Sequence, residues 1–216
     1  MLTVGIRIAL LVIGYCFGLI QTGYLYGKTK GIDIRTQGSG NSGATNSLRV
    51  LGKKAGIIVF FGDALKCLIP CLIVRLICNQ VAPEYTFLYM LYMAFGVTLG
   101  HNFPAHMGFR GGKGIACMGG LSLAFHWGMS LICIIVFGGV VALTKYVSVG
   151  SMSMAVVMFI AALVAGSQGW LGLSGVLLTE FYILAFIIMA LSIWQHRTNI
   201  SRLMNGTENK VGQKKK

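Results

Sequence analysis

The sequence predicts an all-α membrane protein with about seven transmembrane helices, its N-terminus outside the cell and its C-terminus inside. Three observations lead to this prediction. Hydrophobic side chains make up 56% of the 216 residues and charged ones only 11%, and the apolar residues gather in long runs. Lys and Arg number 18 against 5 Asp and Glu, a net charge of +13. Because most of these cations lie in short stretches between the runs, they resemble cytoplasmic loops beside an anionic leaflet rather than a nucleic-acid stripe.

Six apolar runs follow one another along the chain, at about residues 2–27, 55–78, 85–100, 115–143, 147–166 and 175–195. Helices are expected to span the membrane, because backbone groups must be satisfied within a segment and the alternation of barrel strands is missing. The first run continues past the length of a signal-peptide core without a cleavage site, so we interpret it as a retained helix. The fourth run would form about 43 Å of helix against an apolar thickness of about 30 Å. We therefore split it near residues 126–128 and count seven helices.

The cations set the orientation. Lys28 and Lys30 place the end of the first run inside, and the turn NQVAPE, which has no cation, places the next connection outside. Arg110 and Lys113 place the connection after the third run inside. Splitting the fourth run also places Lys145 and the C-terminal tail inside. We treat residues 1–216 as one integral membrane domain and residues 203–216 as a basic, flexible cytoplasmic tail.

A glycine-rich stretch, RTQGSGNSGATNSLRVLG at residues 35–52, interrupts this apolar chain. Its small side chains leave backbone N–H groups unhindered, and Arg35 and Arg49 bracket them with positive charge, which suits a phosphate group. A simple glycine-rich connector between two helices is the alternative, and both stay open. Gly38, Gly40 and Gly43 match the pattern G-x-G-x-x-G, but no strand precedes them and no βαβ unit surrounds them. A dinucleotide-binding fold is therefore rejected.

The segment GHNFPAHMGFRGGKGIA at residues 100–116 is the second polar stretch. Its RGGKG part is similar to the end of a P-loop, but it lacks the first glycine and the Ser or Thr that would hold Mg²⁺ after Lys113. It can present Lys113 and free N–H groups to a phosphate without a metal. A tight turn that caps a helix is the alternative.

Asp63 and Lys66 lie three residues apart on one face of the second run, where ionisable groups are usually paired or functional. We expect no metal site: His101 and His106 span a proline and have no acidic neighbour. The six cysteines fall mostly in apolar runs and show no CxxC pair, so we interpret them as small core residues.

Three motifs, GSGNSGATNSLR, GHNFPAHMGFRGGKG and HRTNISRLMNGTE, follow in this order between the runs. Together they closely resemble the bacterial membrane glycerol-3-phosphate acyltransferases that use acyl phosphate, and the likeness runs nearly end to end. The DALK element at 63–66 and the YVSVGS turn at 146–151 also look like that family. The resemblance implies transfer of an acyl group from acyl phosphate to the 1-hydroxyl of sn-glycerol 3-phosphate. The products would be lysophosphatidic acid and inorganic phosphate, in an early step of phospholipid synthesis.

The same resemblance implies a multi-pass protein of the bacterial plasma membrane with its active site at the cytoplasmic face. It implies no cofactor, no acyl carrier protein and no coenzyme A. The chain departs from the family pattern in places. Leu-Ile-Gln stands at residues 19–21 where Ser-Ile-Pro is usual, and Ile-Ala-Cys at 115–117 where Val-Ala-Thr is common. Ser42 and Ser47 stand where aliphatic residues are more frequent. We expect these changes to affect packing of the donor chain and not the reaction class.

Both substrates are phosphates, so the site must neutralise two anions with fixed cations and neutral donors. His101 is the candidate general base for the glycerol hydroxyl. Alternatively it only positions a phosphate, and the acceptor's own phosphate takes the proton; both remain open. A transporter or channel for phosphate esters is the alternative function, but no inverted repeat is visible. The candidate catalytic residues are His101, Asn41 and Lys113, and the candidate substrate-binding residues are Ser39, Gly40, Thr45, Asn46, Arg49, Lys66, Gly111, Gly112, Ser148, Ser151, His196, Asn199 and Arg202.

Overall fold

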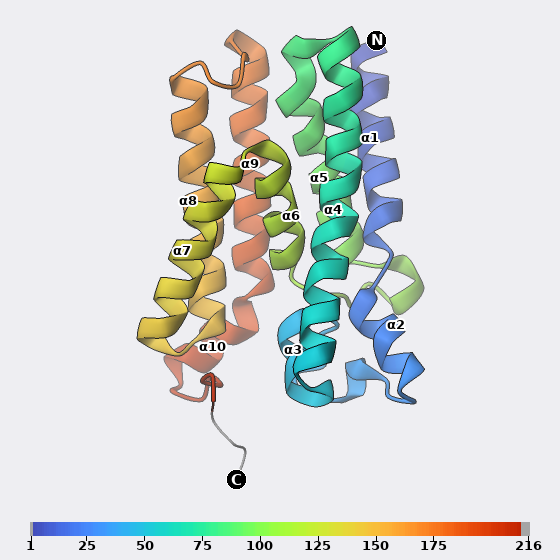
Figure 1. Cartoon of the computed structure of the whole chain (residues 1–216), viewed down its shortest axis with the longest axis vertical. Helices are drawn as coiled ribbons and strands as arrows, with labels where there is room; N and C mark the ends of the chain where they lie inside the picture. The colour runs from blue at the N-terminus through green and yellow to red at the C-terminus, as the bar shows by residue number, and fades with distance from the viewer. Residues whose placement is uncertain (1, 213–216) are drawn as a thin grey trace.

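The structure, a computed structural model, describes residues 2–212, and in these the fold is helical without strands. The long helices run roughly side by side as one bundle (Figure 1). Three short 3₁₀ turns, Ile34–Thr36, Pro83–Tyr85 and Ala105–Met107, lie in the connections. The α-helices are α1 Leu2–Gly18, α2 Thr22–Thr29, α3 Ala44–Leu51, α4 Lys53–Val81, α5 Thr86–Asn102, α6 Ile115–Phe125, α7 Trp127–Thr144, α8 Val147–Ser167, α9 Gly175–Gln195 and α10 Arg197–Met204.

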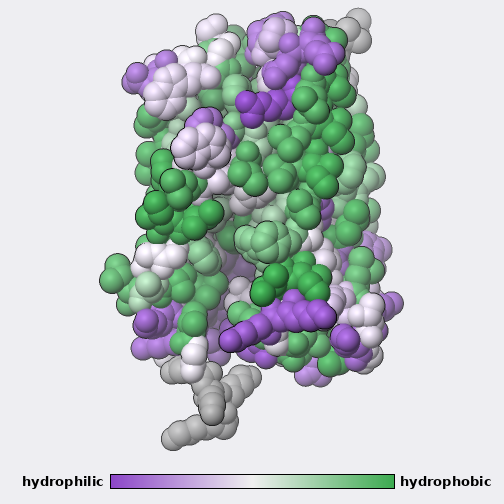
Figure 2. All heavy atoms as spheres, in the orientation of Figure 1, coloured by the Kyte–Doolittle hydropathy of each residue, from purple (hydrophilic) through white to green (hydrophobic). Residues whose placement is uncertain are grey.

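The predicted all-helical membrane architecture is confirmed. Five helical segments of the described chain are long and apolar enough to cross a membrane by length and composition: Thr3–Thr29, Lys53–Val81, Trp127–Thr144, Val147–Ser167 and Gly175–Gln195. Helix α6 is apolar but shorter, with 11 residues, and α5 has 17. On the face shown in Figure 2, apolar side chains form a band across the middle of the bundle, between two polar ends. The orientation of the bundle in the membrane stays a prediction.

The fourth apolar run is split as predicted. Helix α6 ends at Phe125 and α7 begins at Trp127, with His126 between them. The Nδ1 atom of His126 accepts the Gly128 N–H at 3.1 Å. Arg75 of α4 donates to the Ala124 carbonyl at 2.8 Å and to the Phe125 carbonyl at 3.2 Å. The last carbonyls of α6 have no partner within their own helix, and Arg75 satisfies two of them in an apolar region.

The first apolar run is not one continuous helix, because α1 and α2 are separated at residues 19–21. Helix α1 packs closely against α5 through glycines on both helices. A Cβ atom added at Gly18 would lie 2.3 Å from the Val97 carbonyl oxygen, and one at Gly100 would lie 2.1 Å from that of Tyr15. This close packing brings the end of α1, where the chain breaks, next to the end of α5.

A partly buried ion pair joins three helices near the opposite end of the bundle from α3. Arg7 of α1 donates to the Glu180 carboxylate of α9 at 2.5 and 2.7 Å, and the Tyr92 hydroxyl of α5 donates to the same group at 2.6 Å. All six cysteines lie within the described residues, and none forms a disulfide. Five of them are buried and Cys16 is exposed, which agrees with their interpretation as small core residues.

Candidate active site

A pocket of about 430 Å³ opens at the end of the bundle where α3 and α10 lie, in the lower part of Figure 1. This size is within the range of small-molecule sites. Its walls come from the ends of several helices that are distant in sequence. Twelve of the predicted residues line it: Ser39, Asn41, Thr45, Asn46, Arg49, His101, Lys113, Ser148, Ser151, His196, Asn199 and Arg202.

Three helices begin at this pocket. The lining includes the first turns of α3 from Ala44, α6 from Ile115 and α8 from Val147. The N-cap residues of α3 and α6 are Gly43 and Gly114, which have no side chain that could accept a hydrogen bond from the first turn. The N–H groups of a first turn have no partner within the helix, and they carry the positive end of the helix dipole. Three such ends around one pocket favour anions there.

The glycine-rich loop before α3 is shaped by two asparagine side chains. Asn41 accepts the Gly43 N–H at 2.9 Å and donates to the Gly111 carbonyl at 3.1 Å, so it ties this loop to the segment before α6. Asn46 accepts the Ser39 N–H at 2.9 Å. The expectation that Arg35 also faces the site is wrong, because Arg35 pairs with Asp33 at 2.6 Å on the exposed surface and does not line the pocket.

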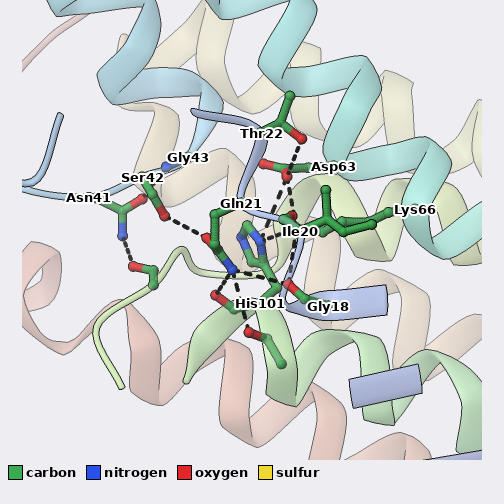
Figure 3. A network of polar contacts seen from close by, with 12 residues as sticks. Gly18, Ile20, Gln21, Thr22, Asn41, Ser42, Gly43, Asp63, Lys66 and His101 are labelled. Atoms are coloured by element: carbon green, nitrogen blue, oxygen red, sulfur yellow. Dashed lines mark hydrogen bonds and ion pairs between the residues drawn. The ribbon is translucent and has the colours of Figure 1, made fainter. Parts of the chain in front are cut away.

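His101 lines the pocket and belongs to a buried polar cluster with Asp63 and Lys66 (Figure 3). The Lys66 ammonium is 2.9 Å from Asp63 Oδ1 and 2.8 Å from His101 Nδ1, and it donates to the Ile20 carbonyl at 2.6 Å. A longer contact of 3.5 Å joins the same ammonium to the Gly18 carbonyl. Because an ammonium cannot accept a hydrogen bond, we assign the lone pair of His101 to Nδ1 and its proton to Nε2. In this tautomer His101 is a hydrogen-bond donor at Nε2.

Lys113 reaches into the pocket from the segment before α6 and donates to the side-chain oxygen of Asn199. Its pKa is lowered to about 8, first because burial removes water from the ammonium and second because Arg202 lies nearby. Lys113 is therefore a cation at neutral pH that titrates close to the physiological range.

His196, at the junction of α9 and α10, is also buried against the pocket. Its Nδ1 atom lies 2.8 Å from the Ser192 carbonyl, which can only accept, so Nδ1 carries the proton and Nε2 the lone pair. Burial, and then the charge of Lys113, lower its pKa to about 4. His196 is thus neutral at working pH. Its Nε2 atom can accept a hydrogen bond, whereas the Nε2 atom of His101 donates one.

Glu208 is a pocket residue that sequence reasoning missed. Its carboxylate accepts from Ser148 at 3.0 Å, from Asn199 at 2.7 Å and from Arg202 at 2.6 Å. Burial raises its pKa, but these hydrogen bonds outweigh burial and leave the pKa below its usual value. Glu208 closes the third motif, HRTNISRLMNGTE, so its position in that motif was a usable signal.

Comparison with known proteins decides what kind of site this is. The family model for glycerol-3-phosphate acyltransferase matches residues 8–206. The chain is 43% identical over 209 residues to the glycerol-3-phosphate acyltransferase of Clostridioides difficile, covering 96% of this chain and 97% of that protein. It is 36% identical to that of Aquifex aeolicus, with 93% and 97% covered. The chain belongs to the glycerol-3-phosphate acyltransferase family.

Solved structures agree with this membership. Crystal structures of PlsY, an integral membrane glycerol 3-phosphate acyltransferase, match in the glycerol 3-phosphate form with a TM-score of 0.82 at 35% identity, covering 95% of this chain and 96% of that one. The lysophosphatidic acid form matches with a TM-score of 0.80 at 34% identity, covering 95% of both chains. The protein is therefore an acyltransferase, and the alternative of a transporter loses its basis.

Four residues predicted to bind substrate do not line the pocket of the acyltransferase: Gly40, Lys66, Gly111 and Gly112. The N–H groups of Gly111 and Gly112 donate to the carbonyls of Asn102 and His101 at 3.1 and 3.0 Å, so the expectation of free N–H groups there is wrong. A Cβ atom at Gly112 would lie 2.0 Å from His101 Nε2, so this glycine allows close approach to the imidazole. Lys66 acts on His101 instead of facing the pocket.

The segment after α10 is held against the pocket as far as residue 211. Glu208 is buried in the contacts above, and the Val211 N–H donates to the Lys145 carbonyl at 2.8 Å. The flexibility predicted for the basic tail at residues 203–216 stays a prediction, and residues 213–216 lie outside the described residues. Among residues 2–212, no three His, Cys, Asp or Glu side chains gather as a metal site would require. Independence from metal stays a prediction.

Proposed function

We propose that the enzyme transfers the acyl group of an acyl phosphate to the 1-hydroxyl of sn-glycerol 3-phosphate. The products are lysophosphatidic acid and inorganic phosphate. The observation that supports this best is the meeting of three helix N-termini with Arg49, Lys113 and Arg202 around one pocket. Such a pocket suits two phosphate groups held close together, as acyl phosphate and glycerol 3-phosphate require.

In the reaction, the oxygen of the glycerol hydroxyl forms a bond to the acyl carbon, and the bond from that carbon to the phosphate oxygen breaks. The leaving group is phosphate, which Lys113 and Arg202 neutralise. With both substrates held in place, much of the rate comes from orientation. Neither a carrier protein nor coenzyme A is needed, because the leaving group is the phosphate itself.

The tautomers of His101 and His196 favour a substrate phosphate, and not His101, as the acceptor of the hydroxyl proton. His101 presents an N–H and stabilises negative charge, while the lone pair of His196 orients the glycerol hydroxyl. With a pKa of about 4, His196 is too weak a base to take the proton efficiently. The proton of the hydroxyl then passes to a phosphate oxygen of a substrate.

The site works at the cytoplasmic face of the bacterial plasma membrane in this proposal. Exposed cations near the pocket end of the bundle, among them Lys28, Lys30, Lys53 and Lys54, support that orientation.

The test uses purified protein with acyl phosphate and glycerol 3-phosphate, in the presence of a chelator of divalent metals. Lysophosphatidic acid and phosphate should form in equal amounts, and acyl-coenzyme A or acyl carrier protein should not replace acyl phosphate. Transfer from acyl-coenzyme A alone, or a requirement for Mg²⁺, would contradict the proposal.

A further inference from the structure

Gln21 lies at the break between α1 and α2, with 1% of its surface exposed. Its amide nitrogen donates to the Gly18 carbonyl at 3.1 Å and to the His101 carbonyl at 3.0 Å. Its amide oxygen accepts from the Ser42 hydroxyl at 2.8 Å. One side chain therefore joins the end of α1, the end of α5 and the glycine-rich loop (Figure 3).

Ser42 stands between Asn41 and Gly43, and both of these line the pocket. Ser42 itself is only 1% exposed and points to Gln21. Its carbonyl oxygen presses against Gly23 at the start of α2, where an added Cβ atom would lie 1.9 Å away. The glycine-rich loop that leads into α3 is thus held in place by the contacts of Ser42 with Gln21 and Gly23.

We propose that Gln21 is a positioning residue, which sets the glycine-rich loop and the start of α3 at the right distance from His101. Gln21 does not line the pocket and acts only through Ser42 and the α5 carbonyls. A glutamine fits because its amide offers two N–H donors and an oxygen acceptor without charge. A buried network of this kind fixes one geometry when all its members are satisfied.

The experiment measures the dissociation constant of glycerol 3-phosphate by calorimetry on the purified full-length protein, together with its melting temperature. The variants are Ser42→Ala, Ser42→Thr, Gln21→Met and the double variant Gln21→Met with Ser42→Ala. The matched control is Ser122→Ala. Ser122 is also 1% exposed and lies 3.0 Å from the Ser130 hydroxyl, and neither serine lines the pocket.

We expect Ser42→Ala to weaken binding about 5-fold and Gln21→Met about 10-fold, the low end of the cost of leaving buried polar groups unpaired. Ser42→Thr keeps the hydroxyl and should bind like the wild type. The double variant should bind no worse than Gln21→Met, because both changes break the same hydrogen bond between Ser42 and Gln21. Ser122→Ala should lower the melting temperature and leave binding unchanged.

The proposal is overturned if Ser42→Ala and Gln21→Met lower only the melting temperature, as the control does, or if their effects on binding multiply in the double variant. Should Gln21→Met fail to fold, the contrast between Ser42→Ala and Ser42→Thr decides alone. The inference rests on the proposed site for glycerol 3-phosphate. Binding is measured without an acyl donor, so an error in the proposed donor would not affect this result.

Discussion

Lys66 and His101 determine each other's role at the level of single residues. The ammonium of Lys66 occupies the Nδ1 side of the imidazole, and Asp63 holds the ammonium in place. Spacing in the sequence pairs Asp63 with Lys66, since both stand on one helix, but His101 stands on another. The sequence could therefore predict the ion pair and not its contact with the histidine. From the sequence alone, Lys66 is therefore predicted to bind phosphate, and the role of His101 stays open.

Two substitutions of His101 separate a hydrogen-bond donor from a general base. A glutamine places its amide near the former Nε2, and an asparagine places it near the former Nδ1. If Nε2–H is the working donor, we expect His101→Gln to keep kcat within about 10-fold and His101→Asn to lose about 10² to 10³, the cost of one preorganised donor. Steady-state kinetics across pH measure both values.

A general base predicts a different outcome for this pair. Neither amide accepts a proton at neutral pH, so both variants would lose about 10² to 10⁴ in kcat to a similar extent. The acidic limb of the pH profile would also disappear in both. That result would contradict the tautomer assigned to His101.

Lys113 should impose an alkaline limit on activity. Its pKa of about 8 means that the cation is present below that pH and is lost as the pH rises through it. We expect kcat/KM to fall above about pH 8, because this ratio reports groups of the free enzyme. In Lys113→Arg the charge persists at all these pH values, so any remaining activity should lack the alkaline limb. A limb that stays in place in this variant would assign it to another group.

Prediction from the sequence did not identify Glu208 as the partner of three predicted site residues. The sequence predicted Ser148, Asn199 and Arg202 as donors for phosphate, and the structure brings all three to the pocket. It also gives them a carboxylate as their present partner. Residue types alone assign such donors to a substrate. The place of Glu208 in the third motif marks it as a candidate site residue, but it does not show that the segment after α10 folds back onto these donors.

The break between α6 and α7 is the element on which the predicted topology depends. It could be predicted because one helix over the whole run would be too long for the membrane. The break at residues 19–21 is harder to predict, because Leu19 and Ile20 continue the apolar pattern and Gly18 alone is a weak stop signal in an apolar run. Tertiary contacts hold this break: the Ile20 carbonyl accepts from Lys66 of α4, and the Gln21 amide donates to the His101 carbonyl of α5.

Arg75 should stabilise the break between α6 and α7. In Arg75→Met the carbonyls of Ala124 and Phe125 lose their donor, at a cost of about 1 to 3 kcal/mol in the free energy of unfolding. Unfolding in mixed detergents measures this cost, and Arg75→Lys should recover part of it. Equal stability of Arg75→Met and wild type would show that these carbonyls are satisfied in another way.

At the scale of the whole molecule, the alternation of helices predicts that Lys145 and Ser201 face the inside and Glu84 the outside. Single cysteines at these exposed positions, in a variant without Cys16, report the side by labelling with a membrane-impermeant thiol reagent in intact cells. We expect labelling at Glu84→Cys only. Labelling of Lys145→Cys from outside would mean that α6 and α7 together cross the membrane once.

In the proposed function, the cation-lined pocket carries out acyl transfer. Its most direct test is kcat/KM for lysophosphatidic acid formation from acyl phosphate in Lys113→Ala, beside Lys53→Ala, which removes an exposed cation outside the pocket. We predict that Lys113→Ala loses about 2 to 4 kcal/mol of transition-state stabilisation, roughly 30- to 1,000-fold, and that Lys53→Ala retains wild-type activity. Equal activity in the two variants would contradict the account.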